Sequence, residues 1–150
     1  MSLPVHADAI SGAIAVKLTK QEMLPVSAQS GDMLMLAESH GTNKSSNWMD
    51  DAEVVNKEID FLLKGSGPQH GYITFAKGED TVDVKWSGHV HTVMVNGQPQ
   101  ISFHGTWEHV KGTGKYQGTQ GKGSYKGRFT SQTDYVVDWV GQEKLPSAGK

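Results

Sequence analysis

Three histidines have the spacing of a metal site. His89 and His91 are two positions apart, so in an extended strand both imidazoles project from one face. His104 lies directly across from His89 if the two segments are joined by a tight turn at Asn96-Gly97. Three imidazole nitrogens can hold Zn²⁺ and leave a fourth position for water. The three histidines are therefore the candidates for a metal site.

The neighbours of these histidines favour a solvent-exposed face instead. Lys85 and Glu108 fall on the same face and opposite each other, as an opposite-charge pair does on the wet side of a sheet. We therefore predict ordinary surface histidines and no bound metal, and we keep His89, His91 and His104 as the metal alternative.

Tyr72, Glu108 and His109 could each carry a proton in a reaction that needs no cofactor. His109 is the most interesting of them, because it shares the apolar face with Trp107. Lys85 is the simpler partner for Glu108. Thiol chemistry is excluded because the chain has no cysteine. The glycine-rich segment fits neither the phosphate-loop nor the dinucleotide pattern, so no cofactor is predicted.

Composition narrows the function classes further. The 150 residues fit one domain, and their net charge of −2 provides no basic surface for nucleic acid. No apolar run reaches the ~18–20 residues of a transmembrane helix. The 18 glycines follow no collagen-like period.

The elements that would position these residues are strands. Helical periodicity is nearly absent, and short β-rich runs are broken by Gly, Asn and Pro roughly every ten residues, as in a sandwich or barrel. One short helix is a candidate at Asn47–Asn56. The predicted strands are Ala13–Leu24, Asp32–Ser39, Val54–Leu63, Gly71–Lys77, Thr81–Val95, Gln100–Val110, Lys122–Ser131 and Tyr135–Gln142.

The Asn96-Gly97 turn fixes a register. Pairing Val95 with Gln98 places Trp86 opposite Trp107 on an apolar face, and it leaves the charged residues on the other face. The same register gives the pairs Gly88–Gly105, Val90–Phe103, Thr92–Ile101, Lys85–Glu108, Ser87–Thr106, His89–His104 and His91–Ser102. We expect the gap at Gly88 and Gly105 to be filled by neighbouring side chains; a kink or a pocket floor is the alternative.

The apolar face continues toward the N-terminus. A four-residue loop at 78–81 would pair Phe75 with Val84 and Ile73 with Trp86, and Lys77 with Val82. The alternation at Ile59, Phe61 and Leu63 extends the same face by one more strand. A sheet with one apolar face must bury that face, so a barrel or a sandwich is predicted.

The glycine-rich stretch carries a resemblance to a known family. A distinctive stretch resembles a segment of the allene oxide cyclase and dirigent barrel superfamily, above all its small, often exported bacterial members. The stretch is Gly105-Thr106-Trp107 followed by Gly112-Thr113-Gly114-Lys115-Tyr116-Gln117-Gly118-Thr119-Gln120-Gly121-Lys122-Gly123-Ser124-Tyr125. Gly71-Tyr72, Trp139-Val140-Gly141 and Leu145-Pro146 are similar as well. The resemblance implies an eight-stranded antiparallel barrel, a homodimer or homotrimer, and a lumen that in the enzymes orients or cyclises reactive intermediates without a cofactor.

We therefore predict an all-β, calycin-like barrel of about eight strands at residues 13–143, flanked by flexible segments at 1–12 and 144–150. The favoured function is non-enzymatic binding of a small apolar or aromatic ligand in the lumen. The alternatives are a cofactor-free cyclase or isomerase and a structural protein with a solid core.

Ala7-Asp8-Ala9 has the form of a signal-peptidase site and suggests a periplasmic or secreted protein, with the cytoplasm as the alternative. The ligand-binding candidates are Ile73, Phe75, Trp86, Phe103, Trp107 and Trp139.

Overall fold

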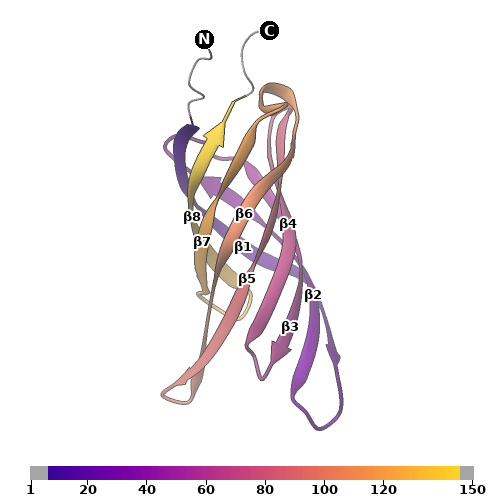
Figure 1. Ribbon diagram of the computed structural model, residues 1–150. Coiled ribbons are helices and arrows are strands. Elements are labelled where there is room, and N and C mark those ends of the chain that lie inside the picture. The colour runs from indigo at the N-terminus through magenta and orange to yellow at the C-terminus, as the bar shows by residue number, and fades with distance from the viewer. Residues whose placement is uncertain (1–6, 146–150) are drawn as a thin grey trace.

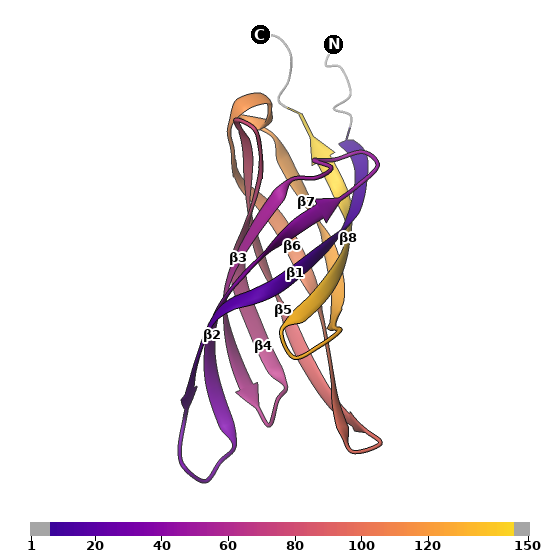
Figure 2. The ribbon, with the colours of Figure 1, turned by 180° about the vertical axis from the view of Figure 1, so that it is seen from behind.

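The protein is an eight-stranded antiparallel barrel. The structure is a computed structural model that describes residues 7–145. Within that range eight strands follow one another around a closed ring, and β1 pairs with β8 to complete it (Figures 1 and 2). The strands are β1 (Ala7–Pro25), β2 (Asp32–Lys44), β3 (Glu53–Leu63), β4 (Gly67–Lys77), β5 (Asp80–Val95), β6 (Gln98–Gly112), β7 (Gln120–Phe129) and β8 (Asp134–Lys144). The predicted fold class is confirmed.

The closure of the ring explains an early start of the first strand. β1 begins at Ala7, inside the segment 1–12 predicted to be flexible, because Ala7 to Lys17 pair with β8. Residues 1–6 and 146–150 of the predicted terminal segments lie outside the described residues. Lys144, predicted to begin the flexible tail, is instead the last residue of β8 and pairs with Ala7.

The register of β5 with β6 is the predicted one. Val95 lies opposite Gln98, and every pair predicted across this hairpin is present. Asn96 and Gly97 have φ angles of 52° and 79°, as a turn with two left-handed residues requires. The apolar face of this hairpin points into the barrel, and the face with the histidines points outward.

The predicted register of β4 with β5 is wrong by two residues. Lys77 pairs with Asp80, because the turn contains only Gly78 and Glu79, with Gly78 at φ 62°. Phe75 then lies opposite Val82, and Ile73 lies opposite Val84. A shift of two residues keeps every side chain on its face, so the inward orientation of Ile73 and Phe75 is unaffected.

The predicted orientation of β3 is wrong. Ile59, Phe61 and Leu63 are 38%, 43% and 63% exposed and lie on the outside of the barrel. The outward apolar side chains continue onto β2, where Leu36 pairs with Ile59. The face of β3 that points inward mixes apolar and polar residues: Val54 and Leu62 lie at its two ends, and Asn56 and Asp60 are buried between them.

The predicted helix at Asn47–Asn56 is absent; the segment is a loop followed by the first residues of β3. Met49 and Asp51 have φ angles of 47° and 66°, which a right-handed helix cannot contain. The Asn43 side-chain amide donates to the carbonyls of Trp48 and Met49 and fixes the loop. Helical structure within residues 7–145 is limited to the 3₁₀ turn η1 (Gly114–Tyr116), so this range has no helix that could span a membrane.

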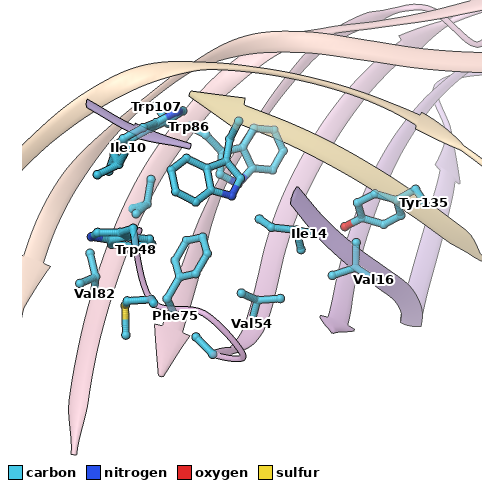
Figure 3. Close-up of a cluster of buried hydrophobic side chains, with 14 of the residues drawn as sticks. Ile10, Ile14, Val16, Trp48, Val54, Phe75, Val82, Trp86, Trp107 and Tyr135 are labelled. Carbon is cyan, nitrogen blue, oxygen red and sulfur yellow. The ribbon is translucent and has the colours of Figure 1, made fainter. Parts of the chain in front are cut away.

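The interior is filled largely by aromatic rings that lie over glycines. Figure 3 shows Trp48, Phe75, Trp86 and Trp107 in the buried cluster, together with Tyr135. A Cβ atom on several lumen-facing glycines would lie within 3 Å of a ring. These glycine–ring neighbours are Gly12 with Trp139, Gly71 with Trp86, Gly123 and Gly141 with Trp107, Gly127 with Phe103, and Gly121 with His109. The glycines thus provide the room in which the rings lie.

Candidate functional site: the barrel lumen

The barrel encloses a cavity of about 360 Å³. All six residues predicted to bind a ligand line it: Ile73, Phe75, Trp86, Phe103, Trp107 and Trp139. The cavity also contradicts the alternative of a solid core, because its volume is within the range of small-molecule pockets. The inward faces of β4, β5, β6 and β8 bring these side chains together, as strand alternation requires.

One end of the cavity is closed by Trp48, which the loop between β2 and β3 carries into the barrel. Its ring centroid lies 4.9 Å from that of Phe75, 5.8 Å from that of Tyr116 and 5.4 Å from that of Trp139. Its Nε1 donates to Oε2 of Glu143 at 2.6 Å, and burial raises the pKa of that carboxyl. Trp48 is therefore held at this end of the cavity by ring contacts and by a hydrogen bond.

The other end of the cavity lies toward the hairpins β1–β2, β3–β4, β5–β6 and β7–β8, opposite the end at which β1 begins and β8 ends (Figures 1 and 2). The cavity wall there includes Met23 of β1, Thr92 of β5 and the exposed Ser131 and Gln132 of the β7–β8 connection. The cavity therefore reaches the molecular surface at this end.

A hydrogen-bonded polar cluster lies on one side of the otherwise apolar wall. Asn56 is its centre: Oδ1 accepts from Trp86 Nε1 at 2.8 Å, and Nδ2 lies 3.1 Å from the Tyr135 hydroxyl and 3.0 Å from Oε1 of Glu58. Trp86 and Tyr135 thus have polar partners although they are buried, and Glu58 receives one donor.

Glu58 and Asp60 form a carboxyl pair on the inward face of β3, two positions apart. Burial, the charge of Asp60 and a hydrogen bond between the two side chains raise the pKa of Glu58 well above its ordinary value. Burial also raises the pKa of Asp60, against the opposing effects of the hydrogen bond with Glu58 and of His70. The pair therefore holds a proton at pH values where exposed carboxyls have lost it.

One oxygen of this pair has no partner. Asp60 is 2% exposed, and its Oδ1 has no hydrogen bond within the described structure. Both residues line the cavity. The site can therefore accept a hydrogen bond from an occupant, or exchange a proton with it.

Tyr125 occupies the space that the facing glycines leave open. Its hydroxyl accepts from Gln69 Nε2 at 2.9 Å, and it would lie 2.5 Å from a Cβ on Gly88 or on Gly105. The expectation that neighbouring side chains fill this gap is confirmed. Burial raises the pKa of Tyr125, and burial likewise raises that of Tyr135.

His109 lies in the cavity wall near its closed end. Its ring stacks on Trp48 and on Trp107, with centroid distances of 5.7 and 5.6 Å. Neither ring nitrogen has a hydrogen-bond partner, and burial lowers the pKa of His109 to about 4. The imidazole is therefore neutral at pH 7. Of the three predicted proton carriers, it alone faces the lumen.

The other two predicted proton carriers lie on the outer surface. Tyr72 is 54% exposed, and Glu108 pairs across the sheet with Lys85 and Lys122. Neither can exchange a proton with an occupant of the cavity, because strand alternation directs both side chains away from it.

His89, His91 and His104 are all exposed on the outer face of β5 and β6. The rings of His91 and His104 are parallel, 5.2 Å apart. Within residues 7–145, no group of three His, Cys, Asp or Glu side chains is arranged to hold a metal ion.

The polar part of the lumen was not anticipated from the sequence. Asn56, Glu58 and Asp60 alternate with Val55, Lys57 and Ile59, and the apolar set at 59, 61 and 63 was assigned to the interior. Polar residues at alternate positions of one strand do not by themselves indicate that the strand points them into a barrel. The inward-facing residues of β3 could have been found by pairing this strand with β4, because Asn56 lies opposite the inward-facing Ile73.

The solved structures that are similar to this chain include two dirigent proteins. The pterocarpan synthase dirigent protein PsPTS1 is 10% identical, with a TM-score of 0.49, over 95% of this chain and 97% of that one. The pterocarpan synthase dirigent protein GePTS1 is 11% identical, also with a TM-score of 0.49, over 94% and 92% of the two chains. No family model matches the sequence. No curated protein matches it either. The resemblance of the sequence to the allene oxide cyclase and dirigent superfamily therefore stays a prediction.

Proposed function

We propose that this barrel binds a small apolar or aromatic molecule in its lumen, without a cofactor. The observation that carries the proposal is the cavity of about 360 Å³ walled by tryptophan, phenylalanine and isoleucine side chains. Sites of this kind bury most of an apolar ligand and fix its orientation with a few polar groups. The cluster around Asn56 would provide those groups.

The test is binding of N-phenyl-1-naphthylamine, an uncharged probe whose emission rises in apolar surroundings. Val137 and Val140 provide a matched pair on β8, because Val137 lines the cavity and Val140 is 55% exposed on the outside. Val137→Trp fills part of the cavity, so we expect the probe's Kd to rise at least about tenfold, the equivalent of about 1.4 kcal/mol. Val140→Trp should leave the Kd unchanged.

Two results would contradict the proposal. One is the absence of any emission rise with the wild-type protein. The other is equal binding by the wild type and Val137→Trp, provided that near-UV circular dichroism shows the variant to be folded, since the probe would then bind elsewhere.

A second candidate function is a cofactor-free cyclase or isomerase. The observation that favours it is the carboxyl pair in the cavity wall, where the raised pKa of Glu58 retains one proton that could serve a general acid. Glu58 would take the role predicted for Tyr72 and Glu108. Turnover of a lumen-bound substrate that is lost in Glu58→Gln, with binding retained, would establish this function over simple binding.

A further inference from the structure

We infer that the molecule bound in the lumen carries a protonated amine, and that Asp60 and Glu58 bind it. This inference rests on the proposed function and goes beyond it, because an apolar cavity alone specifies no charge. Four features of the wall support it.

The first feature is an acid pair without a cation. Among the described residues that line the cavity there is no lysine and no arginine, and the one histidine, His109, is neutral at pH 7. Buried carboxylates in proteins are normally paired with a cation or a metal. His70 lowers the pKa of Asp60, but the His70 side chain is exposed on the outside of β4. The inner side of the pair is left without a positive partner.

The second feature is the direction of the nearby hydrogen bonds. The amide of Asn56 donates to Glu58 and to Tyr135, and the amide of Gln69 donates to Tyr125. Oδ1 of Asp60 receives none of these donors, although the residue is 98% buried. Asp60 lines the cavity, and a carboxylate with one unpartnered oxygen there fits a donor that arrives with the ligand.

The third feature concerns the kind of donor. A hydroxyl would provide one hydrogen bond and no charge, whereas an ammonium group provides up to three donors and a positive charge. The tyrosine hydroxyls of β7 and β8, Tyr125 and Tyr135, have raised pKa values and stay neutral, so they do not compete for the cation. An anionic ligand would be repelled by the pair.

The fourth feature is the small number of oxygen atoms available as ligands near the pair, which disfavours a bound metal ion there. Calcium requires six to eight oxygen ligands. Oδ1 of Asn56 is already occupied by Trp86, and within residues 7–145 no cluster of three metal-ligating side chains is present. A compact organic cation with an aromatic or aliphatic body suits both the pair and the apolar wall around it.

The test uses three probes with one naphthalene body and different tails: 2-(2-naphthyl)ethylamine, 2-(2-naphthyl)ethanol and 3-(2-naphthyl)propanoate. Their Kd values are measured at pH 7 by isothermal titration calorimetry. For the wild type we expect the amine to bind at least about tenfold more tightly than the alcohol, and the propanoate to bind most weakly.

The variants assign this preference to the pair. Asp60→Asn should remove it, so that amine and alcohol bind with similar Kd values, and Glu58→Gln should reduce it. Both substitutions keep the shape of the side chain and replace a buried ionisable carboxyl by a neutral amide, so they do not oppose folding. The control is Glu108→Gln, which changes the net charge equally on the outer surface and should leave the preference intact.

The outcomes separate the two proposals. If the wild type binds amine and alcohol equally, the lumen is a binding site but the inference about an amine is wrong. The inference is also wrong if the preference persists in both Asp60→Asn and Glu58→Gln. If none of the three probes binds, the proposed function fails and the inference fails with it.

Discussion

Gly88 and Gly105 face each other on β5 and β6, and neither position leaves room for a side chain. A Cβ at Gly88 would lie 2.0 Å from the carbonyl oxygen of His104, and a Cβ at Gly105 would lie 2.1 Å from that of Ser87. The atoms in the way belong to the backbone, which cannot rotate aside. Glycine is required at both positions because the two backbones approach each other closely. The Tyr125 hydroxyl occupies the space that the missing side chains leave.

This geometry makes a prediction about stability. Gly88→Ala should lower the free energy of unfolding by about 3 kcal/mol, because the barrel must shift to accept one methyl group. Ser87→Ala, at the adjacent position, is the control and should change it by less than about 0.5 kcal/mol. Urea unfolding followed by tryptophan fluorescence measures both. An equal effect of the two substitutions would contradict the close approach described for Gly88.

The loop at residues 45–52 is the element that distinguishes the two ends of the barrel. It carries Trp48 to a position where it contacts Phe75, Tyr116 and Trp139. The loop is fixed by hydrogen bonds from Asn43 and by an ion pair between Lys44 and Asp51. An element without regular secondary structure thus sets the length of the cavity.

Two substitutions of Trp48 separate its packing from its hydrogen bond. Trp48→Ala should lower the free energy of unfolding by about 4 kcal/mol, as is usual for removing a buried tryptophan. Trp48→Phe keeps a ring but leaves Glu143 without its donor, so a loss of about 1–2 kcal/mol is expected. Urea unfolding at one pH provides both values. Equal losses would mean that the ring contacts contribute little.

Sequence patterns predicted the elements with uneven success, and the reasons are local. The β5–β6 register followed from Asn96-Gly97, because only a two-residue turn suits that pair. The β4–β5 turn was expected to contain four residues and contains two, since Gly78-Glu79 is a less specific signal. The loop around Trp48 was expected to be a short helix, and nothing in the sequence indicates the left-handed backbone there.

The apolar part of the candidate site could be predicted from the sequence, whereas its acid pair could not. Apolar lining residues follow from alternation, and all six of those predicted face the cavity. Glu58 and Asp60 did not follow, because a buried acid pair contradicts the rule by which an interior is recognised. A barrel tolerates polar residues inside when it is not fully packed, and alternation alone does not reveal which strand carries them.

At the scale of the molecule, two groups give opposite pH dependences of stability. The pKa values of Glu58 and Asp60 are raised on folding, so their contribution is present below the unfolded values of about 4–4.5 and is lost as the pH rises through the folded values. The pKa of His109 falls from 6.5 to about 4, so its contribution is present above pH 6.5 and is lost as the pH falls toward 4.

Single substitutions should separate these effects. Glu58→Gln should raise the free energy of unfolding at pH 7 relative to wild type and flatten its decline with rising pH. His109→Phe keeps an aromatic ring and should weaken the loss of stability between pH 6.5 and 4. Urea unfolding at several pH values measures both. An unchanged pH profile in both variants would show that neither group is buried as described.

The pairing of β1 with β8 has a consequence for how the protein is made. Residues 7–17 find their partners only at 134–144, more than a hundred positions later in the chain. On the ribosome, the first seven strands emerge before any residue of the eighth. Until β8 follows, the sheet therefore has two free edges and an uncovered apolar face. β8 covers the edge of β7 and residues 7–17 of β1 at once. Synthesis that stalls before β8 therefore yields a product prone to edge-to-edge aggregation, because β1 and β7 then keep the edges that β8 covers in the closed ring.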